Sequence, residues 1–159
     1  MKEIIDYLTK NNLTISTMES ATGGYLASSI TNIDGSSLVF KFGAVTYSNE
    51  FKIKMGVNKD IIEKYTVYSM ETAKEMSKQI TNFTNSNYGV GVTGKINRYD
   101  PANLTGDNQT VYLSLYDKDN NKYYTKTIKV LNQERVCNKE LIKEEFVKLF
   151  KENIQSKKW

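Results

Sequence analysis

Six segments of the chain have the apolar spacing or the capping residues of helices. They predict helices over 2–11, 25–30, 48–55, 58–66, 69–83 and from Asn138 to Phe150. Ser48 and Ser69 stand directly before two of these segments. A serine side chain in that position accepts from the unpaired amides of the first turn, so we expect both serines to be N-caps.

Five segments alternate between apolar and polar residues or are rich in β-branched and aromatic residues, which is typical of strands. They lie over 13–18, 39–47, 88–92, 110–117 and 122–130. The segment 39–47 is apolar on both faces and therefore predicts a central strand. The turn residues Asp119-Asn120-Asn121 predict that the last two strands form a hairpin, whereas 95–108 is polar and irregular.

The alternation of helices and strands predicts a sheet that is covered by helices on both faces. The late hairpin makes that sheet mixed rather than all-parallel. We therefore expect an α/β fold, a three-layer αβα sandwich with a mixed β-sheet. The 159 residues contain no compositional break, repeat or long linker, so we expect a single domain over 1–159.

The amino-acid composition limits which catalytic groups and which partners are expected. The chain has no histidine, so a reaction here would have neither an imidazole base nor a His-ligated metal. Its net charge of +4 comes from 20 Lys and 2 Arg against 18 acids, which is a poor pattern for specific nucleic-acid recognition. The sequence shows no membrane-spanning window, no signal peptide and only one cysteine, Cys137, which predicts a cytoplasmic protein without a membrane partner.

Three predicted strands end in unusual polar residues. Glu19-Ser20-Ala21-Thr22-Gly23-Gly24 follows the first, Thr46–Lys52 ends and follows the second, and Thr93-Gly94 follows the third. If the three strands are parallel, these loops meet at the carboxyl edge of the sheet, where open α/β sheets bind ligands.

The first of these loops can be interpreted in two ways. The free amides of Thr22, Gly23 and Gly24, with the positive end of the following helix, would suit an anion such as phosphate. Alternatively, Thr22 or Ser20 caps the helix and the glycines allow it to pack on the sheet.

The second loop offers a base for a serine nucleophile. In a chain without histidine, the amine of Lys52 can act as that base if burial or a cationic neighbour lowers its pKa. Its place near the start of a predicted helix would also lower the pKa, because the N-terminal dipole disfavours positive charge. Tyr47 could relay a proton or orient the amine. The alternatives are a half-buried strand aromatic at Tyr47 and a solvated surface lysine at Lys52.

These motifs, in this order, resemble the C-terminal domain of CinA proteins. The family reads E-S-C-T-G-G, G-S-S, V-T-Y-S-N-x-x-K and G-V where this chain has Glu19–Gly24, Gly35–Ser37, Val45–Lys52 and Gly56-Val57. Weaker matches are Val92–Gly94, Thr110–Tyr112 and Arg135, and the resemblance extends from about residue 1 to 152.

The resemblance implies an amidohydrolase of pyridine-nucleotide salvage, which converts nicotinamide mononucleotide into nicotinate mononucleotide and ammonia. Ser20 matches the nucleophile, Lys52 the general base and Tyr47 a residue that assists proton movement, in an acyl-enzyme route without a metal or organic cofactor. The turn after Ser20 would supply the oxyanion donors. The substrate-binding residues would be Glu19, Thr22, Gly23, Gly24, Thr93, Gly94 and Arg135. Family members commonly self-associate, which implies a homo-oligomer.

The chain departs from the family pattern in two places. Ala21 replaces a cysteine, and Lys95–Pro101 replaces a glycine-rich I-A-G-P-x-G-G run. Lys95 and Arg98 either supply charge for a phosphate or belong to a loop that blocks the site. Two alternatives to the amidohydrolase therefore stay open: a nucleotide-binding or regulatory module without turnover, and an amidase for a different small amide.

Overall fold

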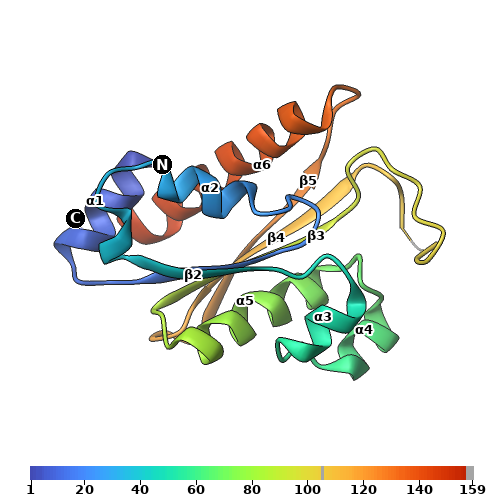
Figure 1. Cartoon of the computed structure of the whole chain (residues 1–159), viewed down its shortest axis with the longest axis horizontal. Helices are drawn as coiled ribbons and strands as arrows, with labels where there is room; N and C mark the ends of the chain where they lie inside the picture. Colours follow the sequence, from blue (N-terminus) through green and yellow to red (C-terminus); the bar gives the residue numbers. More distant parts are fainter. Residues whose placement is uncertain (105, 157–159) are drawn as a thin grey trace.

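A five-stranded mixed sheet separates two layers of helices (Figure 1). The structure is a computed structural model and describes residues 1–104 and 106–156. The strands lie in the order β2-β1-β3-β4-β5, with bounds β1 (Ile15–Glu19), β2 (Phe40–Val45), β3 (Tyr88–Gly94), β4 (Thr110–Asp117) and β5 (Lys122–Lys129). β1 pairs in parallel with both β2 and β3, and the last two pairings are antiparallel. The expected three-layer α/β fold with a mixed sheet is confirmed.

The helices divide between the two faces of the sheet (Figure 1). One layer contains α1 (Lys2–Lys10), α2 (Tyr25–Thr31), α6 (Arg135–Phe150) and the short π-helix η2 (Lys151–Gln155). The other contains α3 (Asn49–Lys54), α4 (Lys59–Tyr65) and α5 (Met70–Thr84), and a 3₁₀ turn η1 (Ser36–Leu38) precedes β2. The larger hydrophobic cluster lies between the sheet and the first layer, and the smaller one, with Met18, Val57, Met76 and Ile80, lies under α5.

The backbone of helix α5 packs directly against the backbone of β3. A Cβ placed on Gly91 would lie 2.2 Å from the carbonyl oxygen of Ala73, and one on Gly89 would lie 2.1 Å from that of Ser77. Alternate positions of β3 are therefore glycines because the backbone of α5 fills the space of a side chain. A buried hydrogen bond of 2.9 Å between Ser77 Oγ and Ser114 Oγ fixes the same helix to β4.

Most predicted elements are confirmed, including both caps. Ser48 Oγ accepts from Phe51 N–H at 3.3 Å, and Ser69 Oγ accepts from Thr72 N–H at 3.2 Å. Among the described residues, no helix is long and apolar enough to cross a membrane. The expected single domain includes residues 157–159, which lie outside the described part of the chain.

Two expectations are wrong. The segment 39–47 does not form a central strand: β2 is an edge strand with largely exposed side chains, and its Phe42 packs against Phe83 at 5.2 Å between ring centroids. Apolar content on both faces reflects surface contacts here, whereas the strands that are buried along their whole length are β1 and the glycine-containing β3. Helix α6 begins at Arg135 rather than at Asn138. The Asn138 side chain is buried in the first turn, where its amide bonds both the N–H and the carbonyl of Leu131 and so ties the helix to the preceding segment.

The contact between α5 and β3 predicts a large loss of stability for Gly91→Ala. The added methyl group would overlap the helix backbone, which cannot move away as a flexible side chain would, so we expect a loss of about 3 kcal/mol, at the upper end of overpacking costs. Urea unfolding measures it. The control is Gly35→Ala, where the Cβ meets nothing within 4 Å and only the positive φ costs about 1 kcal/mol. Equal losses at both positions would contradict the packing argument.

Candidate active site

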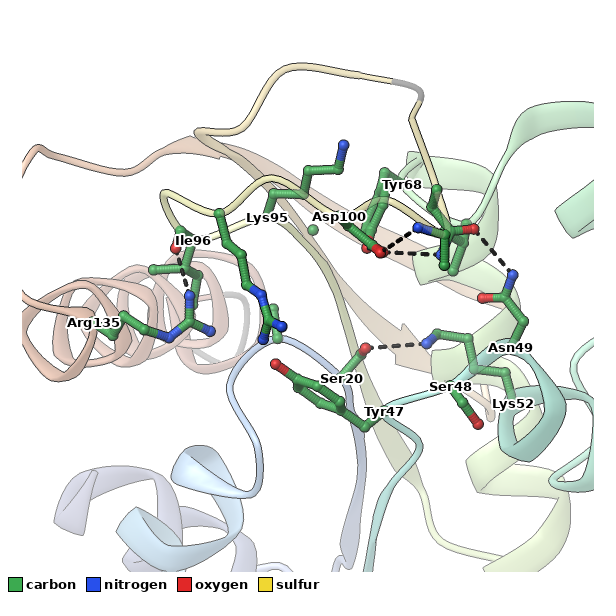
Figure 2. A pocket seen from close by; sticks show the side chains of 16 residues that line it. Ser20, Tyr47, Ser48, Asn49, Lys52, Tyr68, Lys95, Ile96, Asp100 and Arg135 are labelled. Atoms are coloured by element: carbon green, nitrogen blue, oxygen red, sulfur yellow. Dashed lines mark hydrogen bonds between the residues drawn. The ribbon is translucent and has the colours of Figure 1, made fainter.

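The carboxyl ends of β1, β2 and β3 border a pocket of about 340 Å³ (Figure 2). Because these strands are parallel neighbours, the three predicted loops meet at this edge of the sheet, as expected. The lining side chains come from those loops, from α3, from the segment before α5 and from the start of α6.

Ser20 and Lys52 meet at the floor of the pocket. Lys52 Nζ lies 3.0 Å from Ser20 Oγ and donates a second hydrogen bond of 2.8 Å to the carbonyl of Thr46. Both side chains are buried, with exposed fractions of 6% for Ser20 and 1% for Lys52. Their loops are tied to the sheet by backbone bonds from Ser20 N–H to the carbonyl of Val92 and from Thr46 N–H to that of Glu19. The pair is therefore positioned by the sheet rather than by flexible loops.

Burial makes the ammonium group of Lys52 lose its proton more easily than that of an ordinary lysine. Desolvation lowers its pKa from 10.5 to about 8, and the negative charge of Asp100 opposes that shift. The expected contribution of the helix dipole is wrong, because Lys52 lies in the last turn of the six-residue helix α3 and not at its positive end. A substantial fraction of Lys52 is neutral near pH 8, as a general base requires.

Glu19 occupies the N-terminus of α2, where an anionic ligand was one expectation. Its carboxylate accepts from the Thr22 hydroxyl at 2.7 Å and from the amides of Leu26 and Ala27 at 2.8 and 3.0 Å. Glu19 is fully buried, so the helix dipole is satisfied by the protein's own carboxylate. This arrangement favours the alternative in which the turn serves the helix itself.

Five of the ten predicted site residues line the pocket. They are Ser20, Tyr47, Lys52, Gly94 and Arg135, and the other five, which do not line it, are Glu19, Thr22, Gly23, Gly24 and Thr93. The turn residues Gly23 and Gly24 have positive φ angles of 61° and 96° and shape the loop beneath the pocket. Thr93 is buried and donates to the carbonyl of Val67 at 2.9 Å.

Tyr47 and Arg135 stand on the walls of the pocket (Figure 2). Tyr47 is 57% exposed, which rules out the half-buried strand aromatic that was its alternative. Arg135 donates to the carbonyl of Ile96 at 2.5 Å and so connects α6 to the loop after β3.

The loop after β3 lines the pocket through contacts that sequence reasoning missed. Asp100 accepts from the hydroxyl of Tyr68, from Asn103 Nδ2 at 3.0 Å and from the amide of Ala102 at 3.0 Å. Asn103 in turn accepts from Asn49 of α3 at 3.2 Å. The hydrogen bond from Tyr68 is the main cause that lowers the pKa of Asp100. Tyr68 belongs to no motif, and Asn49, the asparagine of the V-T-Y-S-N-x-x-K run, was given no role. The departure of 95–101 from the family pattern was the pointer to this wall.

The pocket is rich in positive charge. Both arginines of the chain, Arg98 and Arg135, line it, although arginine is rare in this lysine-rich sequence. Lys95 lines it as well, is only 4% exposed, and places Nζ 4.8 Å from the centre of the Tyr68 ring. Guanidinium groups bind phosphate and carboxylate in bidentate geometry, so the pocket suits a ligand with an anionic group.

The loop after Ser20 also offers a backbone donor. Ala21 lines the pocket, and among the described residues nothing accepts from its N–H. The amide of the residue after a nucleophile is a common oxyanion donor. In the described part of the chain, no group of three or more Cys, Asp or Glu residues is arranged to hold a metal ion.

Comparisons with known proteins agree on one family. The sequence model described as the CinA C-terminal domain matches residues 1–154. A putative competence-damage inducible protein of Clostridium botulinum strain Langeland is 44% identical over 120 residues, which are 73% of this chain and 29% of that protein. A protein of the same description from Thermoanaerobacter pseudethanolicus is 47% identical over 92 residues, or 57% of this chain and 22% of its own length. The chain thus spans less than a third of these curated relatives.

Solved structures have the same fold. The competence/damage inducible protein CihA of Agrobacterium tumefaciens superposes with a TM-score of 0.79 at 28% identity, covering 92% of this chain and 91% of its own. The competence damage-inducible protein A of Klebsiella pneumoniae gives a TM-score of 0.86 at 19% identity, covering 96% and 93%. At that identity the second match supports the fold alone.

The buried amine predicts that Lys52→Met stabilises the protein near pH 7. A lysine whose pKa falls from 10.5 to about 8 on folding costs about 3 kcal/mol below pH 8, where it is protonated in both states. Methionine has similar length and no charge, and it forfeits two hydrogen bonds, so we expect a net gain of about 1–2 kcal/mol.

The sign of the pH dependence follows from linkage. Between pH 8 and 10.5 the unfolded chain binds the Lys52 proton and the folded chain does not, so wild-type stability rises relative to the variant with increasing pH. Urea unfolding of both proteins at pH 7 and pH 9.5 measures the difference. A stability difference that stays constant over this range would show that the pKa of Lys52 is not lowered on folding.

Proposed function

This chain belongs to the CinA C-terminal domain family, and from that premise we propose that it is an amidohydrolase that deamidates nicotinamide mononucleotide to nicotinate mononucleotide and ammonia. The observation that carries the proposal is the buried hydrogen bond between Ser20 Oγ and Lys52 Nζ at the floor of a pocket. A serine becomes nucleophilic only next to a base, and a partly neutral lysine is such a base.

The first half of the reaction forms an ester on Ser20. Neutral Lys52 keeps one N–H on the carbonyl of Thr46, and its lone pair accepts the proton of Ser20 Oγ as that oxygen attacks the carboxamide carbon. The negative charge that develops on the amide oxygen would be stabilised by the free N–H of Ala21. Protonated Lys52 then gives its proton to the leaving nitrogen. The C–N bond breaks and ammonia departs.

The second half regenerates the enzyme. A water molecule takes the place of ammonia, transfers a proton to Lys52 and attacks the acyl carbon. The ester bond to Ser20 then breaks, and Lys52 returns the proton to Ser20 Oγ. The acid product leaves and loses its remaining proton to solvent, which gives the carboxylate. The same amine therefore acts as base and acid in both halves, which suits a pKa of about 8 better than one of 10.5.

The charge of the pocket supports a nucleoside monophosphate as the substrate. Arg98 and Arg135 line the pocket and would bind a phosphate. The exposed ring of Tyr47 offers an aromatic face next to the Ser20–Lys52 pair (Figure 2). The second candidate, a nucleotide-binding module without turnover, is favoured by the charged loop 95–103 along the pocket wall. The retained serine and a lysine with a lowered pKa favour catalysis over that module.

Ser20→Ala should abolish ammonia release from nicotinamide mononucleotide, with a fall in kcat of at least about 10³-fold. Lys52→Arg should do the same, because a guanidinium stays protonated near neutral pH and cannot act as a base. A coupled ammonia assay measures both. Ser28→Ala, an exposed position on α2, is the matched control and should keep full activity. Retained turnover in Ser20→Ala would remove the serine from the mechanism.

The rate should also depend on pH through Lys52. Because only the neutral amine accepts the serine proton, kcat/KM should rise about tenfold per pH unit below the pKa and level off above about pH 8. Initial rates from pH 6 to 9.5 test this. A flat profile between pH 6 and 8 would exclude Lys52 as the titrating base.

A further inference from the structure

One carboxylate stands among the basic side chains of the pocket. Of the described residues that line it, Lys52, Lys95, Arg98 and Arg135 are basic, and Asp100 alone is acidic. Asp100 comes from the loop that departs from the family pattern, so this charge is a property of this chain that the motif resemblance does not cover.

The negative charge of Asp100 is held mainly by neutral donors, and the positive charge of Lys95 makes a smaller contribution through space. Its oxygens accept from the Tyr68 hydroxyl, the Asn103 amide and the Ala102 N–H, and these bonds favour the ionised form. Within the described residues, no lysine or arginine lies within ion-pair distance of it. Dipoles stabilise a carboxylate without cancelling its charge, so Asp100 presents a net negative charge to the pocket.

Asp100 and Arg135 lie on different sides of the pocket, and Lys95 places Nζ 4.8 Å from the centre of the Tyr68 ring (Figure 2). Asp100 and Tyr68 lie on the side of the pocket where Lys52 approaches Ser20, and Arg135 lies on the opposite side next to Ile96. The negative charge of Asp100 reaches Lys52, since it acts on the protonation of that amine. A ligand that fits this arrangement has an anionic group at one end and a positive charge near the bond that reacts.

We propose that Asp100 is a specificity-determining residue, which selects amides whose ring is positively charged over neutral amides of the same shape. The inference rests on the proposed function and names its substrate class: the pyridinium form of the nicotinamide ring, attached to a sugar phosphate. Opposite charges a few ångströms apart in a partly desolvated pocket attract strongly enough to change affinity about tenfold.

Comparing the oxidised and reduced forms of nicotinamide mononucleotide tests the effect of the ring charge while the shape of the ligand stays nearly the same. Both have the same carboxamide, ribose and phosphate, but the dihydropyridine ring of the reduced form is uncharged. Asp100→Asn keeps one oxygen that accepts from Tyr68 and Asn103, removes the charge and gives up the hydrogen bond from the Ala102 N–H. Asp100→Glu keeps the charge, and Asp60→Asn removes the same charge from the exposed surface of α4.

Binding is measured by titration calorimetry in the Ser20→Ala protein, so that no turnover occurs. We expect the oxidised nucleotide to bind about tenfold more weakly when Asp100→Asn is added, and the reduced nucleotide to change less than twofold. Asp100→Glu should restore most of the preference for the oxidised form, and Asp60→Asn should leave both affinities unchanged. In the active protein, Asp100→Asn should lower the ratio of kcat/KM for the two nucleotides by a similar factor.

Two results would overturn the inference and keep the proposed function. Equal weakening of both nucleotides would assign Asp100 a purely structural role, and no change in either would remove it from recognition. If neither nucleotide binds and the wild-type protein releases no ammonia, the proposed function fails and the inference fails with it.

Discussion

The site depends on burying an amine without giving it a carboxylate partner. A lysine in an ion pair would be cheaper to bury, but its pKa would rise and it could not act as a base near neutral pH. Lys52 instead has a carbonyl and a hydroxyl as its partners, which satisfy hydrogen bonds without adding negative charge. The negative charge of Asp100 acts on Lys52 only through space, without a hydrogen bond between them. The loss of stability and the larger fraction of neutral amine near pH 8 are two results of the same burial.

The rest of the fold keeps that amine in place. Three parallel strands bring the loops after β1, β2 and β3 to one edge, and the backbone of Ser20 and Thr46 continues the hydrogen bonding of the sheet beyond the strand ends. Glu19 fixes the loop from below by capping α2 with its own carboxylate. A buried carboxylate directly before the nucleophile therefore serves the geometry of the loop, and the pocket can keep its positive charge for a ligand.

Local patterns predicted most of the fold and the reacting pair. Caps such as Ser48 and motifs such as Glu19–Gly24 are short, so the residues that define them are adjacent in the sequence. Several of the misjudged features depend on contacts between residues that are not adjacent in the sequence. The edge position of β2 is set by pairing with β1, and the role of Glu19 depends on amides seven and eight residues away. The contact of Tyr68 with Asp100 joins residues 32 positions apart, and no periodicity reports such a pairing.

Chemistry and recognition are carried by different segments of the pocket. Ser20 and Lys52 follow β1 and β2 and are fixed by the sheet, whereas Arg98 and Asp100 belong to the loop after β3, which is tied to the remainder by side-chain bonds such as Asn49 to Asn103. The side-chain hydrogen bonds that hold this loop can change with its sequence while the strands stay in place. The loop after β3 can therefore differ from the glycine-rich form typical of the family while the serine and the amine keep their 3.0 Å contact. A change of ligand preference without loss of the reacting pair is the expected consequence of this division.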